Sequence, residues 1–278
     1  MNRSASQIYS DSFEDLRSNP VLLVPNVLTN LVYFAITATV GASIALNHAV
    51  TGNFNSPTSS DIRKMIVAAL VLWLVEMAGF CLLQCMAVEA VTEGRASLGS
   101  GLRSLGEHFV PFLGALFLQA AIGIVVIIGG MGIAAAGGAG TGLIAVLAVG
   151  AALLFLFFTF PAIVYNDIGP LAALAESYDK VKKNFIRVLG FVFITAILAI
   201  GLSFAFAVVG AFFGLLGSIL LLVFGIVFST LVLMALTRLY IEISWREAQE
   251  LEARKERVAA RSYESGGGAH TQSWQQPL

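Results

Sequence analysis

The chain has 278 residues, of which 58% are hydrophobic and 12% are charged, and its mean hydropathy is +0.86. This balance excludes an ordinary soluble domain, in which about 25% of the residues are charged. The 16 Lys and Arg are matched by 17 Asp and Glu and are scattered along the chain, which excludes the basic patch of a nucleic-acid-binding protein. The composition predicts an all-α polytopic membrane protein whose main partner is the lipid bilayer, with no nucleic acid partner.

The N-terminal residues 1–20 contain no apolar run of the signal-peptide type, and we expect them to form a cytoplasmic elbow. The first apolar segment after them is too long for a signal peptide, so we expect it to be a retained membrane anchor. Six apolar segments follow, each near the ~20 residues that an α-helix needs to cross ~30 Å of hydrocarbon. They lie at about residues 21–46, 65–91, 109–135, 141–165, 186–211 and 214–243. Residues 21–243 therefore form the predicted transmembrane domain. Residues 244–278 form a predicted cytoplasmic tail that is first helical and then disordered.

The distribution of Lys and Arg predicts the orientation of these spans, because cationic loops are retained in the cytoplasm. With the N-terminus inside, 14 of the 16 basic residues fall on the inner side, and only Arg63 and Lys64 fall outside. The connections near 136–140 and 212–217 carry no charge. We therefore predict a multi-pass protein of the cytoplasmic membrane with both termini in the cytoplasm.

Residues 168–187 form a predicted amphipathic helix between the fourth and fifth spans. Its apolar residues recur at steps of three and four, at Leu171, Leu174, Tyr178, Val181 and Phe185, and charged residues fill the remaining arc. We expect this elbow helix to lie on the inner membrane surface and the chain to bend near Asn184. Its cations would then contact anionic headgroups. The candidate contacts are Lys180, Lys182, Lys183, Arg187 and, on an earlier segment, Arg103.

The same apolar pattern occurs twice more, each time before an odd-numbered span. The second copy is Leu98, Leu102, Leu105 and Phe109, and the third is Tyr9, Phe13, Leu16 and Pro20. The chain can therefore be interpreted as three repeats of an elbow helix plus a transmembrane hairpin. The alternative is a chance register, since one amphipathic stretch can be aligned with another.

The stretch "NDIGPLAALAESYDKVKKNFIRVLG", residues 166–190, and its weaker echo at 93–114 resemble a group of uncharacterised six-span prokaryotic membrane proteins. The stretch is also similar to the membrane domain joined to some glycerophosphodiester phosphodiesterases. The resemblance implies the six-span topology. No segment outside the predicted spans is long enough for the soluble phosphodiesterase barrel, so the resemblance carries over no catalytic residues.

One ionisable residue, Glu76 in "LVLWLVEMAGF", falls near the middle of the second predicted span. A charge at that depth costs about 2.5–3.5 kcal/mol on insertion scales unless it is paired or neutral. One interpretation is a proton relay or a substrate contact. The other is a protonated carboxyl group that bonds a neighbouring helix, with Thr37 and Ser229 at similar depth.

Four polar residues form a second candidate tier nearer the inner face: Asn30, Gln84, Gln119 and Thr195. Such side chains most often form interhelical hydrogen bonds worth about 0.6 kcal/mol each. The alternative is that they line a cavity open to the cytoplasm, with Glu89 and Arg238 near its mouth.

The sequence predicts no catalytic residues, no metal site and no cofactor. His48, His108 and His270 fall in three different regions, and Cys81 and Cys85 lie inside an apolar run. The preferred interpretation is a non-catalytic membrane component that organises lipid or membrane or cytoplasmic partner proteins. The alternative is a small-solute or ion transporter or channel that uses Glu76, and a lipid-modifying enzyme comes third.

Overall fold

The computed structural model describes residues 3–51, 58–137, 150 and 154–266. Within these ranges the chain is almost entirely helical and contains no strand. Its elements are α1 (Ala5–Ser18), η1 (Pro20–Leu23), α2 (Val24–Thr51), α3 (Ser59–Glu93), α4 (Leu98–Gly137), α6 (Thr159–Asn166), α7 (Pro170–Lys183), α8 (Phe185–Phe213) and α9 (Leu215–Gly266).

Five helical stretches among the described residues are long and apolar enough to cross a membrane. They are Pro20–Val50, Ser59–Glu93, Leu98–Gly129, Phe185–Gly210 and Ile219–Val258. The chain is thus a multi-pass membrane protein, as its composition predicts. Residues 141–149 and 151–153 of the predicted fourth span, 141–165, lie outside the described residues, as does most of the uncharged connection at 136–140. The helix α6 is the described end of that segment.

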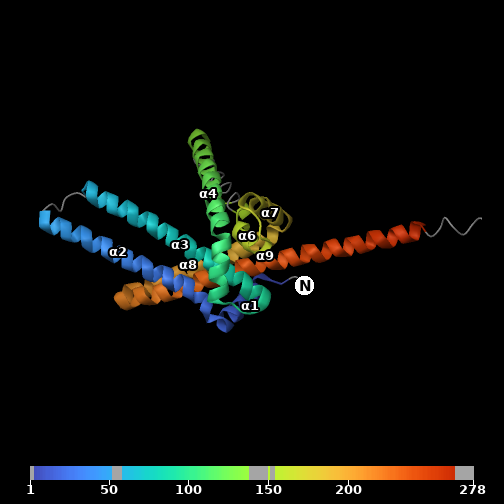
Figure 1. Ribbon diagram of the computed structural model, residues 1–278, viewed down its shortest axis with the longest axis horizontal. Helices are drawn as coiled ribbons and strands as arrows, with labels where there is room; N and C mark the ends of the chain where they lie inside the picture. Colours follow the sequence, from blue (N-terminus) through green and yellow to red (C-terminus); the bar gives the residue numbers. More distant parts are fainter. Residues whose placement is uncertain (1–2, 52–57, 138–149, 151–153, 267–278) are drawn as a thin grey trace, which may run out of the picture.

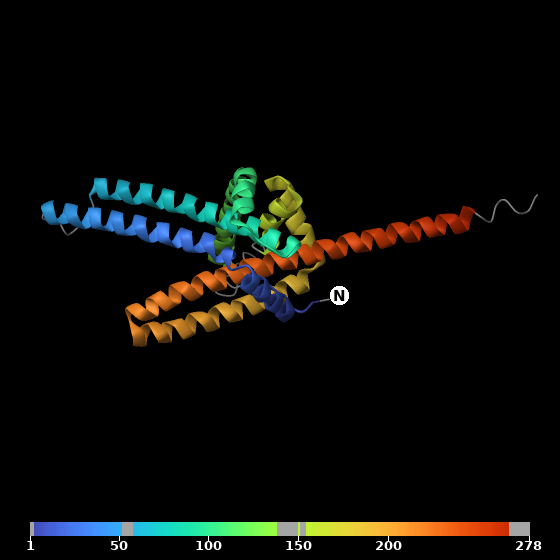
Figure 2. The ribbon, with the colours of Figure 1, turned by 60° about the horizontal axis from the view of Figure 1, so that its bottom comes forward.

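The long helices diverge from one common region, as the two ribbon views show (Figures 1 and 2). The α2–α3 hairpin and the α8–α9 hairpin extend to the same side and splay apart, whereas helix α4 extends in another direction; we call them the three arms. Helices α1, η1, α6 and α7 pack where the arms meet, and we call this region the base. The last part of α9 continues beyond the base in one unbroken helix, which includes the predicted helical tail.

The base contains the apolar core of the molecule. Aromatic side chains from several helices and from the segment before α6 meet there: Tyr9 stacks on Phe191 with ring centroids 5.3 Å apart, and Phe158 lies 5.5 Å from Tyr240. Each such buried ring removes roughly 150–250 Å² of surface from water. By contrast, at most 22% of the most apolar window of any of the five stretches is buried inside the molecule. The base therefore fixes the arms, and the arms expose apolar surface to their surroundings.

The predicted bend near Asn184 is present. Helix α7 ends before this residue and α8 begins directly after it. The Asn184 side chain donates to the Lys180 carbonyl oxygen at 3.0 Å and accepts from the Arg246 guanidinium at 2.6 Å. A local hydrogen bond of this kind satisfies a carbonyl that the end of a helix would leave free.

The second elbow helix is not a separate element. Residues 98–109 are the first turns of α4, which continues through Pro111 to Gly137. The ring of His108, at the position equivalent to Asn184, bonds within its own helix, with Nδ1 2.9 Å from the Ser104 carbonyl oxygen. An apolar periodicity of 3.6 residues is the same in a separate helix and in the first turns of a longer one, so the pattern could not distinguish them.

The predicted corner between the last two spans is present at Gly214. Helix α8 ends at Phe213 and α9 begins at Leu215, so one residue reverses the chain. Its φ of 53° lies in the left-handed region that glycine adopts without a steric penalty.

Candidate functional site

Ion pairs join the N-terminal helix α1 to α9 at the base. The two terminal nitrogens of Arg238 lie 2.9 Å from Asp11 Oδ2 and 2.6 Å from Asp15 Oδ2. Arg3 Nη1 lies 2.8 Å from the same Asp11 oxygen. Helix α1 is thereby held by charge as well as by the stacking of Tyr9, whose burial raises the pKa of its hydroxyl group.

A second set of ion pairs joins α7 to α9. Lys180 Nζ lies 3.1 Å from Glu247 Oε2 and 3.4 Å from Glu176 Oε1, and it sits 5.1 Å from the centroid of the Tyr240 ring. Only 7% of the Lys180 side chain is exposed. Burying this ammonium group requires such partners, because an unpaired charge in the interior is costly.

The structure separates the five predicted headgroup contacts into two groups. Lys180 lies inside the base, and Arg187 turns toward α9, where its Nη2 atom lies 2.7 Å from Glu242 Oε1. Three of the five are exposed: Lys182, Lys183 and Arg103. The amphipathic pattern of residues 168–187 shows only that its cations share the polar face of one helix. It cannot show that acids of α9 pack against part of that face.

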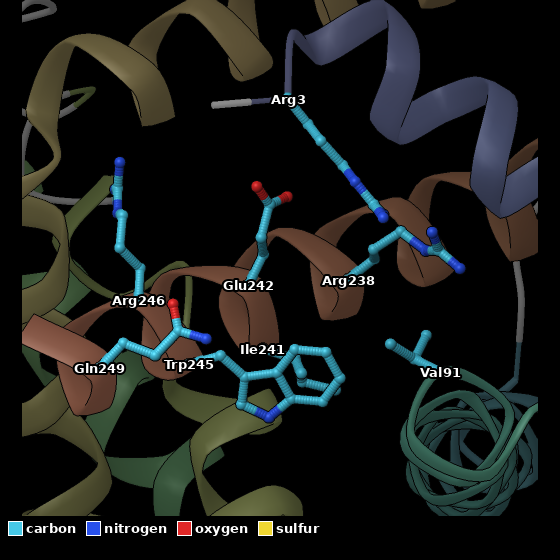
Figure 3. Close-up of a pocket in the computed structure, with 8 residues that line it drawn as sticks. All are labelled: Arg3, Val91, Arg238, Ile241, Glu242, Trp245, Arg246 and Gln249. Atoms are coloured by element: carbon cyan, nitrogen blue, oxygen red, sulfur yellow. The ribbon is translucent and has the colours of Figure 1, made fainter. Parts of the chain in front are cut away.

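Two cavities lie side by side at the base and share Arg3 and Arg246; we call them the first and the second cavity. The first has a volume of about 350 Å³. Its lining residues are Arg3, Val91, Arg238, Ile241, Glu242, Trp245, Arg246 and Gln249. The Glu242 carboxylate points into the space between the side chains of Arg3 and Arg246 (Figure 3).

The second cavity has a volume of about 560 Å³ and lies where α8 leaves the base. Its lining residues are Arg3, Lys182, Lys183, Asn184, Phe185, Ile186, Arg187 and Arg246. Five of these eight are cationic and none is acidic. Such a concentration of positive charge around a concave surface favours a ligand that carries more than one negative charge.

Two guanidinium nitrogens beside these cavities have no hydrogen-bond partner among the described residues. They are Arg187 Nη1 and Arg238 Nε, and both are buried. The Glu242 Oε2 atom is in the same state. A buried polar atom without a partner costs about 1–3 kcal/mol, so the base keeps these groups at some cost in stability.

Glu76 lies on an exposed face of α3. Within the described ranges its carboxylate makes no hydrogen bond and no ion pair. Ser229 accepts instead from Asn26 Nδ2 at 3.1 Å, and Thr37 is exposed on α2. The structure therefore does not bring together the three residues that the sequence placed at similar depth.

The four residues of the predicted polar tier bind four different partners. Asn30 donates to the Asn26 carbonyl oxygen at 2.8 Å, and Gln84 donates to Thr237 Oγ1 at 2.8 Å. The two other bonds are Gln119 Nε2 to the Leu156 carbonyl oxygen at 3.3 Å and Thr195 Oγ1 to the Tyr9 hydroxyl at 2.5 Å. None of the four lines the first or the second cavity. Three of the four bonds join different segments of the chain, which favours interhelical hydrogen bonds over a shared cavity wall, whereas the Asn30 bond lies within α2.

No group of three or more His, Cys, Asp or Glu residues that could hold a metal ion occurs in the described part of the chain. His48 Nε2 lies 3.4 Å from Asp61 at the far end of the α2–α3 arm, and His108 Nε2 lies 3.4 Å from Asp167. Cys81 and Cys85 are buried as free thiols. His270 lies outside the described residues.

The sequence reasoning did not find the two cavities. Arg3 and Arg246 are separated by most of the chain, and only the packing of α1 against α9 makes them neighbours. The sequence does contain one related signal, the excess of Lys and Arg on the predicted inner side. This excess indicates the side of the membrane on which an anion-binding site would lie, but not which residues form it.

Comparison with protein families identifies one match, which covers residues 4–243. The chain belongs to the family described as a domain of unknown function, DUF7847. The match includes all three arms and most of the base, and Arg246 lies just beyond it. A search of curated proteins and a search of solved structures found no match. The resemblance to membrane domains joined to glycerophosphodiester phosphodiesterases stays a prediction.

Proposed function

We propose that this chain is a non-catalytic component of a prokaryotic cytoplasmic membrane that organises lipid or partner proteins around its base. The observation that carries this proposal is the exposure of cations directly beside apolar helices. Lys182 and Lys183 are exposed at the end of α7, and the exposed apolar residues of α8 begin at Phe185 and Ile186. Cations at the edge of an apolar span attract the anionic lipids of the inner leaflet, by about 1 kcal/mol per Lys or Arg.

The paired charges of the base support a role without chemistry. The Arg238, Lys180 and Arg187 side chains bind acids of neighbouring helices, and these contacts fix the helices in place. A catalytic group or a transported ion would need a polar group that is free to react or to exchange partners. The described ion pairs instead hold the helices of the base together, and the three arms extend from this base.

Lipid clustering in proteoliposomes tests this proposal. The full chain is reconstituted in vesicles of phosphatidylcholine with a small fraction of a self-quenching fluorescent phosphatidylglycerol. We expect the protein to increase quenching of the anionic probe and to leave a zwitterionic probe of the same fluorophore unchanged. Equal distribution of both probes would contradict the lipid-organising role.

Transport through the arms is the second candidate, because Glu76 presents a carboxylate on an exposed face of a membrane-spanning helix. Such a residue is often part of an ion or proton path. Proton and solute flux measured in the same vesicles separates the two roles. Flux that is present in the natural chain and lost in both Glu76→Gln and Glu76→Leu would replace our proposal with transport.

A further inference from the structure

The second cavity continues into an apolar strip on the outside of α8. Ile186, Leu189 and Phe193 follow one another at steps of three and four, so they share one face of the helix. Their exposed fractions are 79%, 41% and 65%. The strip begins at the cavity itself, because Ile186 is one of the residues that line it.

Cations above an apolar strip fit a phospholipid better than a soluble anion. The guanidinium and ammonium groups of Arg3, Arg187 and Lys183 can bind the oxygens of a phosphate, and arginine can do so with two parallel hydrogen bonds. A free phosphate ion would contact only the cationic part of this surface and not the apolar strip. An acyl chain attached to the phosphate would also cover Ile186 and Phe193.

Acids of neighbouring helices compensate only part of the positive charge at the cavity. Arg3 pairs with Asp11 and Arg187 with Glu242, whereas Lys183 reaches only to 3.9 Å from Glu247, with 65% of its side chain exposed. Within the described residues Lys182 makes no ion pair and lies over the Tyr178 ring, 5.8 Å from its centroid. Both lysines therefore keep charge available for a ligand.

Arg187 also lines the second cavity. It binds Glu242 through Nη2, and its Nη1 atom is buried and has no acceptor among the described residues. Its guanidinium group therefore adds positive charge next to a phosphate bound in the cavity.

We propose that the second cavity binds the phosphate-bearing headgroup of one anionic phospholipid, whose acyl chain lies along Ile186, Leu189 and Phe193 of α8. This inference rests on the proposed function and gives it a defined site. The bound lipid connects α1, α7 and α9 at the point where the α8–α9 arm enters the membrane. The cavity therefore binds one lipid as part of the structure, which differs from the general attraction of anionic lipids to a positively charged surface.

Native mass spectrometry of the full chain in detergent tests the site. The delipidated protein is mixed with phosphatidylglycerol, with phosphatidylcholine or with inorganic phosphate. We expect one phosphatidylglycerol per chain to be retained at least ten-fold more strongly than phosphatidylcholine. The paired change Lys182→Gln and Lys183→Gln is expected to reduce this retention about ten-fold, and Arg3→Gln is expected to reduce it in the same direction.

The matched control is the paired change Arg17→Gln and Arg95→Gln, which removes the same charge from exposed positions that line neither cavity. It is expected to retain the lipid as the natural chain does. Equal loss in both pairs would show a general charge effect and would overturn the site. Retention unchanged by Lys182→Gln and Lys183→Gln would also overturn it. Binding of inorganic phosphate as strong as that of the lipid would overturn the assignment to a phospholipid.

The two proposals fail in different ways. Lipid clustering in vesicles without retention of a single lipid would contradict the site and leave the proposed function. Retention of one lipid without clustering would contradict the proposed function and leave the site.

Discussion

Arg238 is the residue on which the attachment of α1 depends most directly. It reaches two acids of α1, Asp11 and Asp15, and 16% of its side chain is exposed. Removing one member of a largely buried ion pair leaves the other member desolvated and without a partner. The contribution of Arg238 to stability is therefore measured by the loss of stability when its side chain is replaced.

We predict that Arg238→Gln lowers the free energy of unfolding by about 2 kcal/mol, because two carboxylates of α1 lose their partner. The measurement is thermal unfolding of the purified chain in detergent. The control is Arg103→Gln, whose side chain is 86% exposed and pairs, among the described residues, with Glu107 one helical turn away, so its loss costs at most about 0.5 kcal/mol. Similar shifts for both variants would show that the Arg238 pairs contribute little.

Single residues were the least predictable level of the structure. The sequence identified Lys180 as a cation of an amphipathic helix, but its partners Glu176 and Glu247 come from its own helix and from the C-terminal helix. A pattern along one segment gives the face of a residue and not the groups that pack on that face. Glu76 shows the same limit, because the sequence gives its position along the helix α3 but not the exposed face on which it lies.

The α8–α9 hairpin depends on close approach of two helices next to the Gly214 turn. A Cβ atom on Gly217 would lie 2.8 Å from the Gly210 Cα atom and 2.9 Å from the Val209 carbonyl oxygen. Both are backbone atoms, so they cannot move aside as a flexible side chain can. The absence of a side chain at Gly217 lets the two helices touch.

We predict that Gly217→Ala destabilises the chain by about 1–3 kcal/mol, because the added methyl group forces the two backbones apart. The matched control is Gly225→Ala in the same helix, where an added Cβ meets no atom within 4 Å. The control is expected to leave the unfolding midpoint unchanged or slightly raised, since alanine favours the helix. Thermal unfolding of both variants in detergent is the measurement, and equal effects would contradict the close contact at Gly217.

The elements themselves were largely predictable, because a membrane-spanning helix is encoded by length and apolarity alone. Five of the six predicted spans correspond to helices of the structure, and the chain turns at Asn184 and within the predicted connection at 212–217. The elbow at residues 98–109 was wrong as a separate helix. A chain reversal that depends on one residue can be predicted from the sequence. Whether a helix stops or continues into the next segment depends on residues outside the amphipathic pattern, so it could not be predicted at residues 98–109.

At the scale of the whole molecule, the base and the arms have different requirements for stability. The base is held by buried aromatic rings and ion pairs, as in a soluble domain. The arms bury little surface against the rest of the molecule, so an apolar environment must cover them. The sequence predicted the arms from composition, but the base requires contacts between α1, α7 and α9 that no local pattern contains.

The arrangement of base and arms leads to a prediction about which parts of the chain face opposite sides of the membrane. Gln249 is exposed on α9 at the base, and Ser60 is exposed at the far end of the α2–α3 arm. One membrane-spanning helix, α3, separates that end from the base. The two native thiols, Cys81 and Cys85, are both buried, so they provide a low background for labelling.

We therefore predict that Gln249→Cys and Ser60→Cys react with a membrane-impermeant maleimide from opposite sides of sealed vesicles. In inside-out vesicles Gln249→Cys should be labelled and Ser60→Cys should be protected, because the side with most Lys and Arg faces the cytoplasm. Right-side-out vesicles should give the reverse, and detergent should expose both sites equally. The natural chain, with no added cysteine, measures any reaction of the buried thiols. Labelling of both variants from the same side would contradict the passage of α3 across the bilayer and, with it, the division into a base on one face and arms within the membrane.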